Sequence, residues 1–196
     1  METRRFDAAV ARFAATNAQD PEQVSENGVP VPRTLAHACW LSGWIERLTP
    51  NASEALRLAA HCQHLARWTT PRSTYPEGRR GYLTWRRDRA KFHAELAGKV
   101  LRDVGYDDET VDRVRRINLK QGLGQVGDAQ TMEDALCLTF LEHEAAAFAG
   151  RHDAVKVTEI LRKTWMKMSP RAREFALAVE LPTGVRELLE AALGTP

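Results

Sequence analysis

Four histidines and one aspartate lie on stretches of sequence whose other regularly spaced residues are apolar. Hydrophobic residues follow His37 at offsets of 4, 7 and 11, which fall on one side of an α-helix. His64, His93 and Asp134 belong to similar stripes, and His61 precedes His64 by three residues. Because an unpaired imidazole or carboxylate is costly to bury, we expect these side chains to contact one another, a metal ion or an anionic ligand. Neutral imidazoles with a carboxylate can bind Mn, Fe, Zn or Ni, so all five residues are candidate ligands of a divalent metal ion.

The alternative is that each histidine packs separately in the core. A backbone carbonyl or a neighbouring hydroxyl group then satisfies each imidazole, and no common site forms. The residue types alone assign a catalytic role to none of them.

Arginines and aromatic residues are concentrated between residues 67 and 91, so they separate two of the candidate histidines. This segment has eight cations against two acids, and guanidinium groups bind phosphate while aromatic rings stack on bases. We therefore predict that it forms a phosphate-binding lid over the site. The predicted substrate-binding residues are Arg67, Arg72, Arg79, Arg80, Trp68 and Tyr75. The alternative is a solvated loop whose rings pack onto the helices.

Helical spacing of apolar residues extends over almost the whole chain, which predicts an all-α, single-domain bundle over residues 1–196. The domain divides into an N-terminal helix and loop (1–32), a core (33–168) and C-terminal helices (169–196). The predicted helices cover residues 5–17, 33–48, 53–68, 82–104, 107–121, 131–149 and 153–167, with two more after Ser169 and Pro182. Proline and glycine predict loops over 20–32 and 69–81.

Composition narrows the class of protein. The 28 lysines and arginines nearly balance the 26 acids, and 43% of the residues are hydrophobic, as expected for a globular domain. The three scattered cysteines, Cys39, Cys62 and Cys137, indicate a reducing cytoplasm, and neither a signal peptide nor a membrane span is predicted. Walker, GxSxG, HExxH and dinucleotide-binding motifs are absent from the sequence.

Three segments resemble the HD-domain superfamily of metal-dependent phosphohydrolases. LAAHCQHLAR is similar to the segment that carries the family's His-Asp pair, FHAELAGKVLRDVGY to the following histidine helix, and MEDALCLTFLE to the helix with a late aspartate. Where the family has adjacent His and Asp, this chain has Gln63-His64. The resemblance implies an HD-like helical fold and a metal bound by His64, His93 and Asp134.

A closer resemblance covers most of the chain after residue 53. GYLTWRRDRAKFHAELAGKVLRDVGYDDETVDRV, EDALCLTFLEHE and HDAVKVTEILRKTWMKMSPR resemble the domain-of-unknown-function family 4202. Members of that family are sometimes labelled glutamyl-tRNA synthetase. Here only KMSPR (167–171) is similar to a synthetase signature, and the chain lacks both its companion motif and the alternation of strands and helices. We therefore do not expect a synthetase.

Three functions follow as hypotheses. The first is an HD-like metal-dependent hydrolase that acts on a phosphorylated substrate, either a nucleotide or an RNA end. The second is a non-catalytic module that binds RNA, in particular tRNA, through the same arginines and rings. The third is an HD-like iron-dependent oxygenase. The expected partner is a phosphorylated small molecule or RNA and not a membrane, and the oligomeric state is left open.

Overall fold

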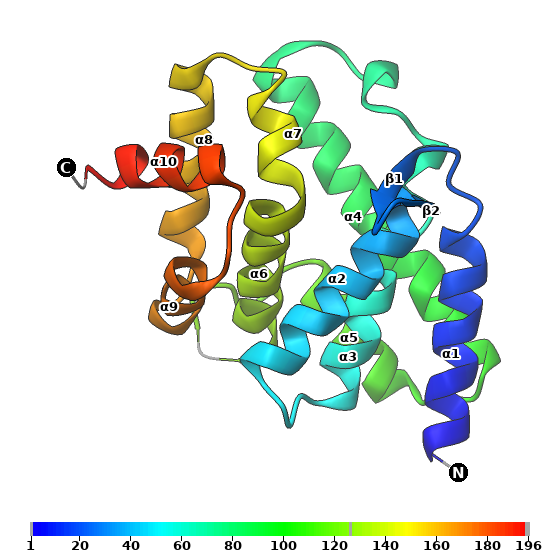
Figure 1. Ribbon diagram of the computed structural model, residues 1–196. Coiled ribbons are helices and arrows are strands. Elements are labelled where there is room, and N and C mark those ends of the chain that lie inside the picture. The colour runs from blue at the N-terminus through cyan, green and yellow to red at the C-terminus, as the bar shows by residue number, and fades with distance from the viewer. Residues whose placement is uncertain (1, 126, 195–196) are drawn as a thin grey trace.

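The computed structural model describes residues 2–125 and 127–194. They form an all-α domain with one small hairpin (Figure 1). Its helices are α1 (Glu2–Asn17), α2 (Arg33–Leu48), α3 (Glu54–Cys62), α4 (Gly78–Asp103), α5 (Asp108–Asn118), α6 (Asp128–Thr139), α7 (Ala145–Ala149), α8 (Ala154–Lys167), α9 (Pro170–Ala178) and α10 (Thr183–Leu193). Within the described residues, no helix has both the length and the apolar character needed to cross a membrane.

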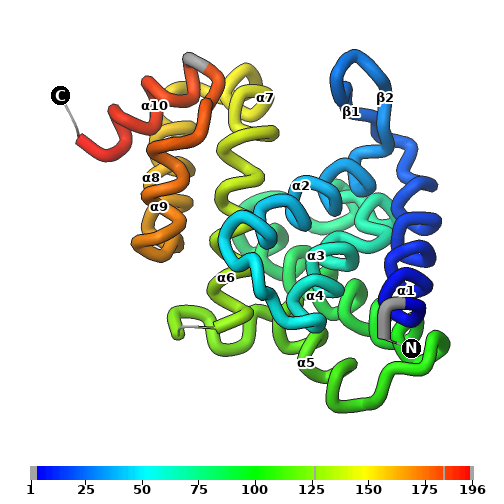
Figure 2. The backbone as a smooth tube through the Cα atoms, turned by 60° about the horizontal axis from the view of Figure 1, so that its bottom comes forward, coloured from blue at the N-terminus to red at the C-terminus, as the bar shows by residue number. Residues whose placement is uncertain are grey.

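The helices pack around one hydrophobic core. Helix α2 lies against α3 and α6, α4 lies against α5, and α8 lies against α10. Figure 2 shows α8, α9 and α10 grouped at one end, with α1 at the opposite end. Side chains from most of these helices, among them Phe13, Leu41, Leu101 and Leu138, are fully buried in a single cluster. The all-α prediction is confirmed.

Several helices begin at residues whose side chains cap the first turn. Helix α2 has the predicted bounds, and the Ser53 hydroxyl accepts a hydrogen bond from the backbone N–H of Leu56 at the start of α3. Asp153 caps α8 and Ser169 caps α9 in the same way.

The prediction of a loop over 20–32 is wrong for residues 23–32, which form a hairpin. Strands β1 (Gln23–Glu26) and β2 (Val29–Pro32) pair antiparallel. Asn27 and Gly28 connect them with φ of 51° and 82°. Positive φ at both positions is the pattern of a type I′ turn, for which Asn-Gly is a strong signal.

The helix predicted over 53–68 ends at Cys62. Ala66 has φ of 53°, a left-handed conformation that is unfavourable for alanine, and short 3-10 helices follow at Arg67–Thr69 and Arg72–Thr74. The next helix, α4, begins at Gly78 rather than at residue 82. At Gly81 a Cβ atom would lie 1.8 Å from the backbone oxygen of Pro76, so only glycine allows the loop to approach the helix this closely.

The helix predicted over 131–149 is interrupted by a π-helical turn. Helix α6 ends at Thr139, residues Phe140–Glu144 form the wider turn, and α7 follows. In this turn Glu142 accepts a hydrogen bond from Trp44 Nε1 at 2.8 Å, and Glu144 forms an ion pair with Arg33 at 3.0 Å. The π turn therefore anchors this part of the chain to α2.

Candidate phosphate-binding cavity

Three of the candidate histidines form a row inside the molecule. His37 comes from α2, His64 from the unwound segment after α3, and His93 from α4. The ring centres of His37 and His64 are 4.2 Å apart, and those of His64 and His93 are 6.1 Å apart. The structure thus brings together three of the residues that the sequence selected.

The imidazole of His93 is held in a defined orientation. It is 2% exposed, and its Nδ1 lies 2.6 Å from the carbonyl oxygen of Leu65. Nδ1 must therefore carry the proton and donate it, which leaves a lone pair on Nε2. Nε2 is buried and has no partner among the described residues.

All three imidazoles in the row are neutral at pH 7. Burial lowers the pKa of His37 and that of His93 to about 4. Burial, followed by the charges of neighbouring groups, also holds the pKa of His64 well below its usual value. Protonation of this row is unfavourable because the positive charge would be poorly solvated.

Asp134 lies outside this row. Its carboxylate accepts hydrogen bonds from the backbone N–H of Ser169 at 2.8 Å, from the Ser169 hydroxyl at 2.6 Å and from Gln130 Nε2 at 2.9 Å. The buried carboxylate thus fixes the start of α9. His61 is also separate, since its ring faces Phe6 of α1 at 6.2 Å.

The predicted metal ligands do not form a metal site. Among residues 2–125 and 127–194, no group of three or more His, Cys, Asp or Glu side chains is arranged to hold a metal ion. In particular, Asp134 is engaged by Ser169 and Gln130 and does not complete a donor set with His64 and His93. The residues described here therefore do not fit the divalent ion that the HD-like pattern implied.

We expect Asp134→Ala to lower the free energy of unfolding by about 3 kcal/mol, because it leaves buried donors without an acceptor. Asp153→Ala removes a similar cap at the exposed start of α8 and serves as a matched control, for which a clearly smaller loss is expected. Urea unfolding measures both. Equal, small losses in the two variants would contradict a structural role for Asp134.

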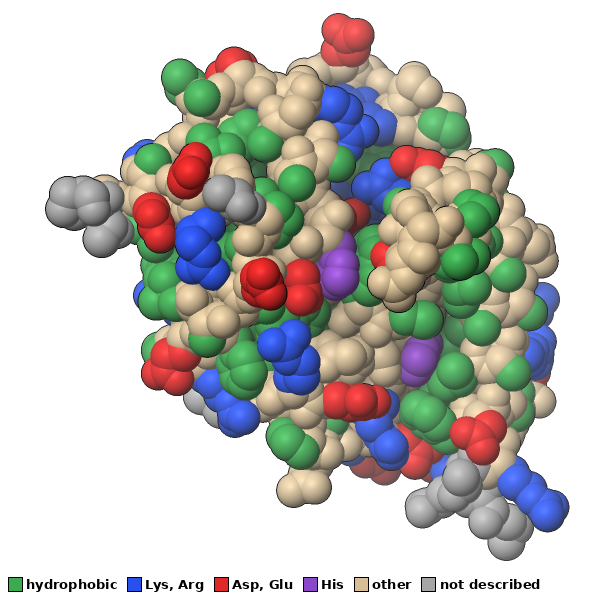
Figure 3. Space-filling model, in the orientation of Figure 1, with side chains coloured by type: hydrophobic (Ala, Val, Ile, Leu, Met, Phe, Trp, Pro, Cys, Tyr) green, Lys and Arg blue, Asp and Glu red, His purple; other side chains and the backbone are tan. Residues whose placement is uncertain are grey.

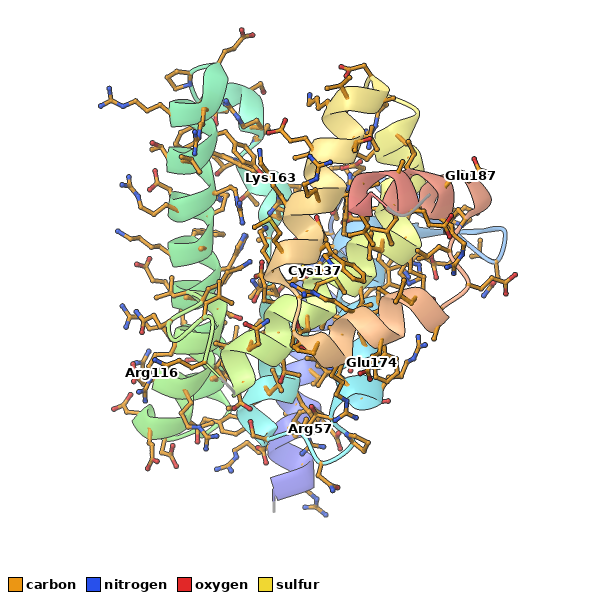
Figure 4. All side chains as sticks on the ribbon, turned by 90° about the vertical axis from the view of Figure 1, so that its left-hand side faces the viewer. Arg57, Arg116, Cys137, Lys163, Glu174 and Glu187 are labelled. Atoms are coloured by element: carbon orange, nitrogen blue, oxygen red, sulfur yellow. The ribbon has the colours of Figure 1, made fainter. Side chains whose placement is uncertain are left out.

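A cavity of about 410 Å³ lies beside the histidine row, between α4 and the pair α6 and α8. Cys137, one of its lining residues, is labelled in Figure 4. Six cationic side chains line it, against the single acid Glu133. The cations are Arg67, Arg86, Arg87, Arg89, Lys120 and Lys167.

Within the described part of the chain, the two arginines of the cavity wall that are not exposed have no carboxylate partner. Arg89 is only 9% exposed, and its Nε and Nη1 atoms are buried without a hydrogen-bond acceptor. The guanidinium of Arg67 lies 4.6 Å from the centre of the Trp85 ring, and burial lowers its pKa. Because buried cations are normally paired, this arrangement favours an anionic ligand.

The two lysines of the cavity share one buried carboxylate. Glu133 is 3% exposed; it forms a close ion pair with Lys120 and lies 3.6 Å from Lys167 Nζ. Burial acts to raise the pKa of Glu133, but Lys120, Lys167 and Arg86 together lower it below its usual value, so it remains ionised. The cavity therefore keeps a large positive excess at neutral pH.

A second cavity, of about 510 Å³, shares His64 and Arg67 with the first. His37, Trp68 and Trp85 also line it. Figure 3 shows a hollow on this side of the molecule, beside the hairpin, with basic side chains inside it. Arg67 and the histidine row thus form a wall between two cavities.

The other predicted substrate-binding residues have different positions. The Arg72 guanidinium donates to the backbone oxygens of Tyr75 and Pro76, at 2.9 and 2.8 Å, and so shapes its own loop. Arg79 and Arg80 are exposed on α4, and the Tyr75 hydroxyl donates to Asp88 at 3.2 Å. Of the six predicted substrate-binding residues, only Arg67 therefore lines the first cavity, whereas Arg67, Trp68 and Arg72 line the second.

Several lining residues of the first cavity were missing from the sequence-based site. Arg89 could have been found, because it lies four residues before His93 on the same stripe of α4. Lys120 and Lys167 could not have been found in this way, because neither shares a helical stripe with a candidate histidine. Each lies near the end of a different helix. Only the fold brings them to Glu133.

Fold and cavity together define a small helical protein with a basic cavity. The chain belongs to the family described as Domain of unknown function (DUF4202), whose model matches residues 7–189. This confirms the family resemblance seen in the sequence. Neither the curated proteins nor the solved structures include a match to the chain.

Proposed function

We propose that this protein binds a phosphorylated ligand, a nucleotide or an RNA end, through its phosphate group in the first cavity. One observation carries the proposal: Arg67 and Arg89 line the same cavity, and neither has a carboxylate partner in the described residues. Arginine presents a planar fork of donors that matches two phosphate oxygens. In such a partly enclosed site the attraction between opposite charges is stronger than in water.

The charge of the cavity favours phosphate over a carboxylate ligand. Six cations against one acid leave a positive excess that a single carboxylate could not balance. A phosphate or pyrophosphate group carries more negative charge and offers more acceptor oxygens. The class of ligand is therefore set by the arginines and lysines and requires no contribution from Asp134.

Hydrolysis of the bound phosphate ester is a second candidate function, favoured by the state of His93. Because its Nδ1–H donates to Leu65, Nε2 of the neutral ring is left as a hydrogen-bond acceptor. We propose that it accepts a hydrogen bond from the attacking water and orients it, while Arg67 and Arg89 stabilise the negative charge that develops.

Calorimetric titration with inorganic phosphate and with pyrophosphate tests binding. We expect one site for each, with pyrophosphate about tenfold tighter, and weaker binding of both at high salt. Absence of heat with both anions would contradict the proposal. Phosphate release from nucleotides by the wild type, lost in His93→Gln, would support hydrolysis, whereas binding without release would restrict the function to binding.

A further inference from the structure

The basic cavity continues onto an exposed surface of α4. A shallow hollow on this surface is lined by Arg79, Arg80, Leu83, Thr84 and Arg87. Leu83 and Arg87 also line the first cavity, so the two depressions adjoin. Figure 4 shows long side chains that end in nitrogen projecting from the outer side of α4.

Most cations of this surface have no ion pair within the described residues. Of Arg79, Arg80, Arg86, Arg87 and Lys91, only Arg87 pairs with an acid, Asp88, at 3.1 Å. From Arg79 to Lys91 the helix advances by about 18 Å. This distance suits an extended polyanion better than a single small ion.

Apolar side chains are exposed among these cations. Tyr82 is 43% and Leu83 51% exposed, and the Arg86 guanidinium lies 5.7 Å from the centre of the Tyr82 ring. A tyrosine flanked by arginine is a platform on which a nucleic-acid base can stack. Polyphosphates and sulfated polymers have no flat apolar groups that would use it.

We propose that a single-stranded polynucleotide lies along the exposed face of α4 with its terminal phosphate in the first cavity. We call this exposed face, formed by Arg79, Arg80, Tyr82, Leu83 and Arg87, the α4 track. This inference rests on the proposed function, because the cavity receives the end of the strand. It adds the class of ligand, a polynucleotide longer than one nucleotide, and the direction in which the strand leaves the cavity.

The test is affinity for single-stranded RNA and DNA of one, four and eight nucleotides, with a phosphate at the 5′ end, at the 3′ end or at neither. We expect affinity to rise at least about tenfold from one nucleotide to eight and to be higher with a phosphate at one end. The double variant Arg79→Glu/Arg80→Glu should lose this increase with length. Its binding of inorganic phosphate should be unchanged, since neither residue lines the cavity.

A second double variant, Arg115→Glu/Arg116→Glu, is the matched control. It makes the same change in charge on exposed residues of α5, so it tests whether position on α4 matters. The plot of log affinity against log salt concentration has a negative slope. Its magnitude should decrease by about 1.4 in the α4 variant, which loses two phosphate contacts, and by less in the control.

Three results would overturn the α4 track. One is phosphate binding without any gain from added nucleotides, which would leave the proposed function intact. The second is an equal loss of oligonucleotide affinity in the α5 control. The third is equal affinity for inorganic polyphosphate of the same charge. If oligonucleotides bind but neither phosphate nor pyrophosphate does, the proposed function fails and the placement of the strand end fails with it.

Discussion

Arg89→Met is expected to weaken phosphate binding by about 30-fold or more and, at the same time, to make the ligand-free protein more stable. Losing one partner of a buried, hydrogen-bonded charge pair costs about 2–5 kcal/mol of binding free energy. In the absence of ligand, however, the buried Nε and Nη1 atoms of Arg89 have no acceptor. Methionine is apolar and similar in length, so we expect the free energy of unfolding to rise by about 1 kcal/mol.

The opposite signs of these two changes distinguish a ligand-binding arginine from a structural one. Titration with pyrophosphate and urea unfolding of the same samples measure both. Arg102→Met is the control, because it makes the same substitution on the same helix at an exposed position. A loss of stability in Arg89→Met together with unchanged binding would show that Arg89 serves the fold.

The histidine row is expected to make the protein sensitive to mild acid. The pKa of His37 and that of His93 are lowered from 6.5 to about 4 in the folded state. Between these two values the unfolded chain binds more protons than the folded one, so stability falls as the pH falls. Above pH 6.5 both imidazoles are neutral in the folded and in the unfolded state, so the free energy of unfolding has its full value. Near pH 4 it has fallen by about 3 kcal/mol for each of these two residues.

Chemical unfolding at pH 7.5, 6.0, 5.0 and 4.5 measures this loss. His37→Leu should flatten the dependence by removing one buried titrating group, whereas replacement of the exposed His152 by glutamine should leave it unchanged. A flat profile from pH 6.5 to 4.5 in the wild type, or equal slopes in all three proteins, would contradict a buried neutral row.

Local signals in the sequence predict most of the helices. The bounds of α2 and the caps at Ser53, Asp153 and Ser169 depend on residues within one turn, so they could be read directly. The early end of α3 at Cys62 could not be predicted, because no local sequence pattern marks it or the left-handed conformation of Ala66 that follows. That unwinding is what places His64 and Arg67 at the cavity.

The apolar stripes in the sequence predict which polar residues are buried more reliably than they predict which residues those side chains contact. They correctly placed His37 and His93 inside, where His64 meets both, and they also placed Asp134 inside. The partner of Asp134, however, is Ser169, which lies 35 residues later, and only the turn between α8 and α9 brings them together. Of the five candidate ligands, Asp134, which the HD-like pattern selected, and His61, which was selected by its spacing to His64, do not reach the site.

A crystal structure of the protein grown with pyrophosphate tests the central claim most directly. The predicted result is the anion in the first cavity, with its oxygens about 3 Å from guanidinium nitrogens of both Arg67 and Arg89. An anion bound only elsewhere, with Arg67 and Arg89 turned toward carboxylates such as Glu133, would contradict it.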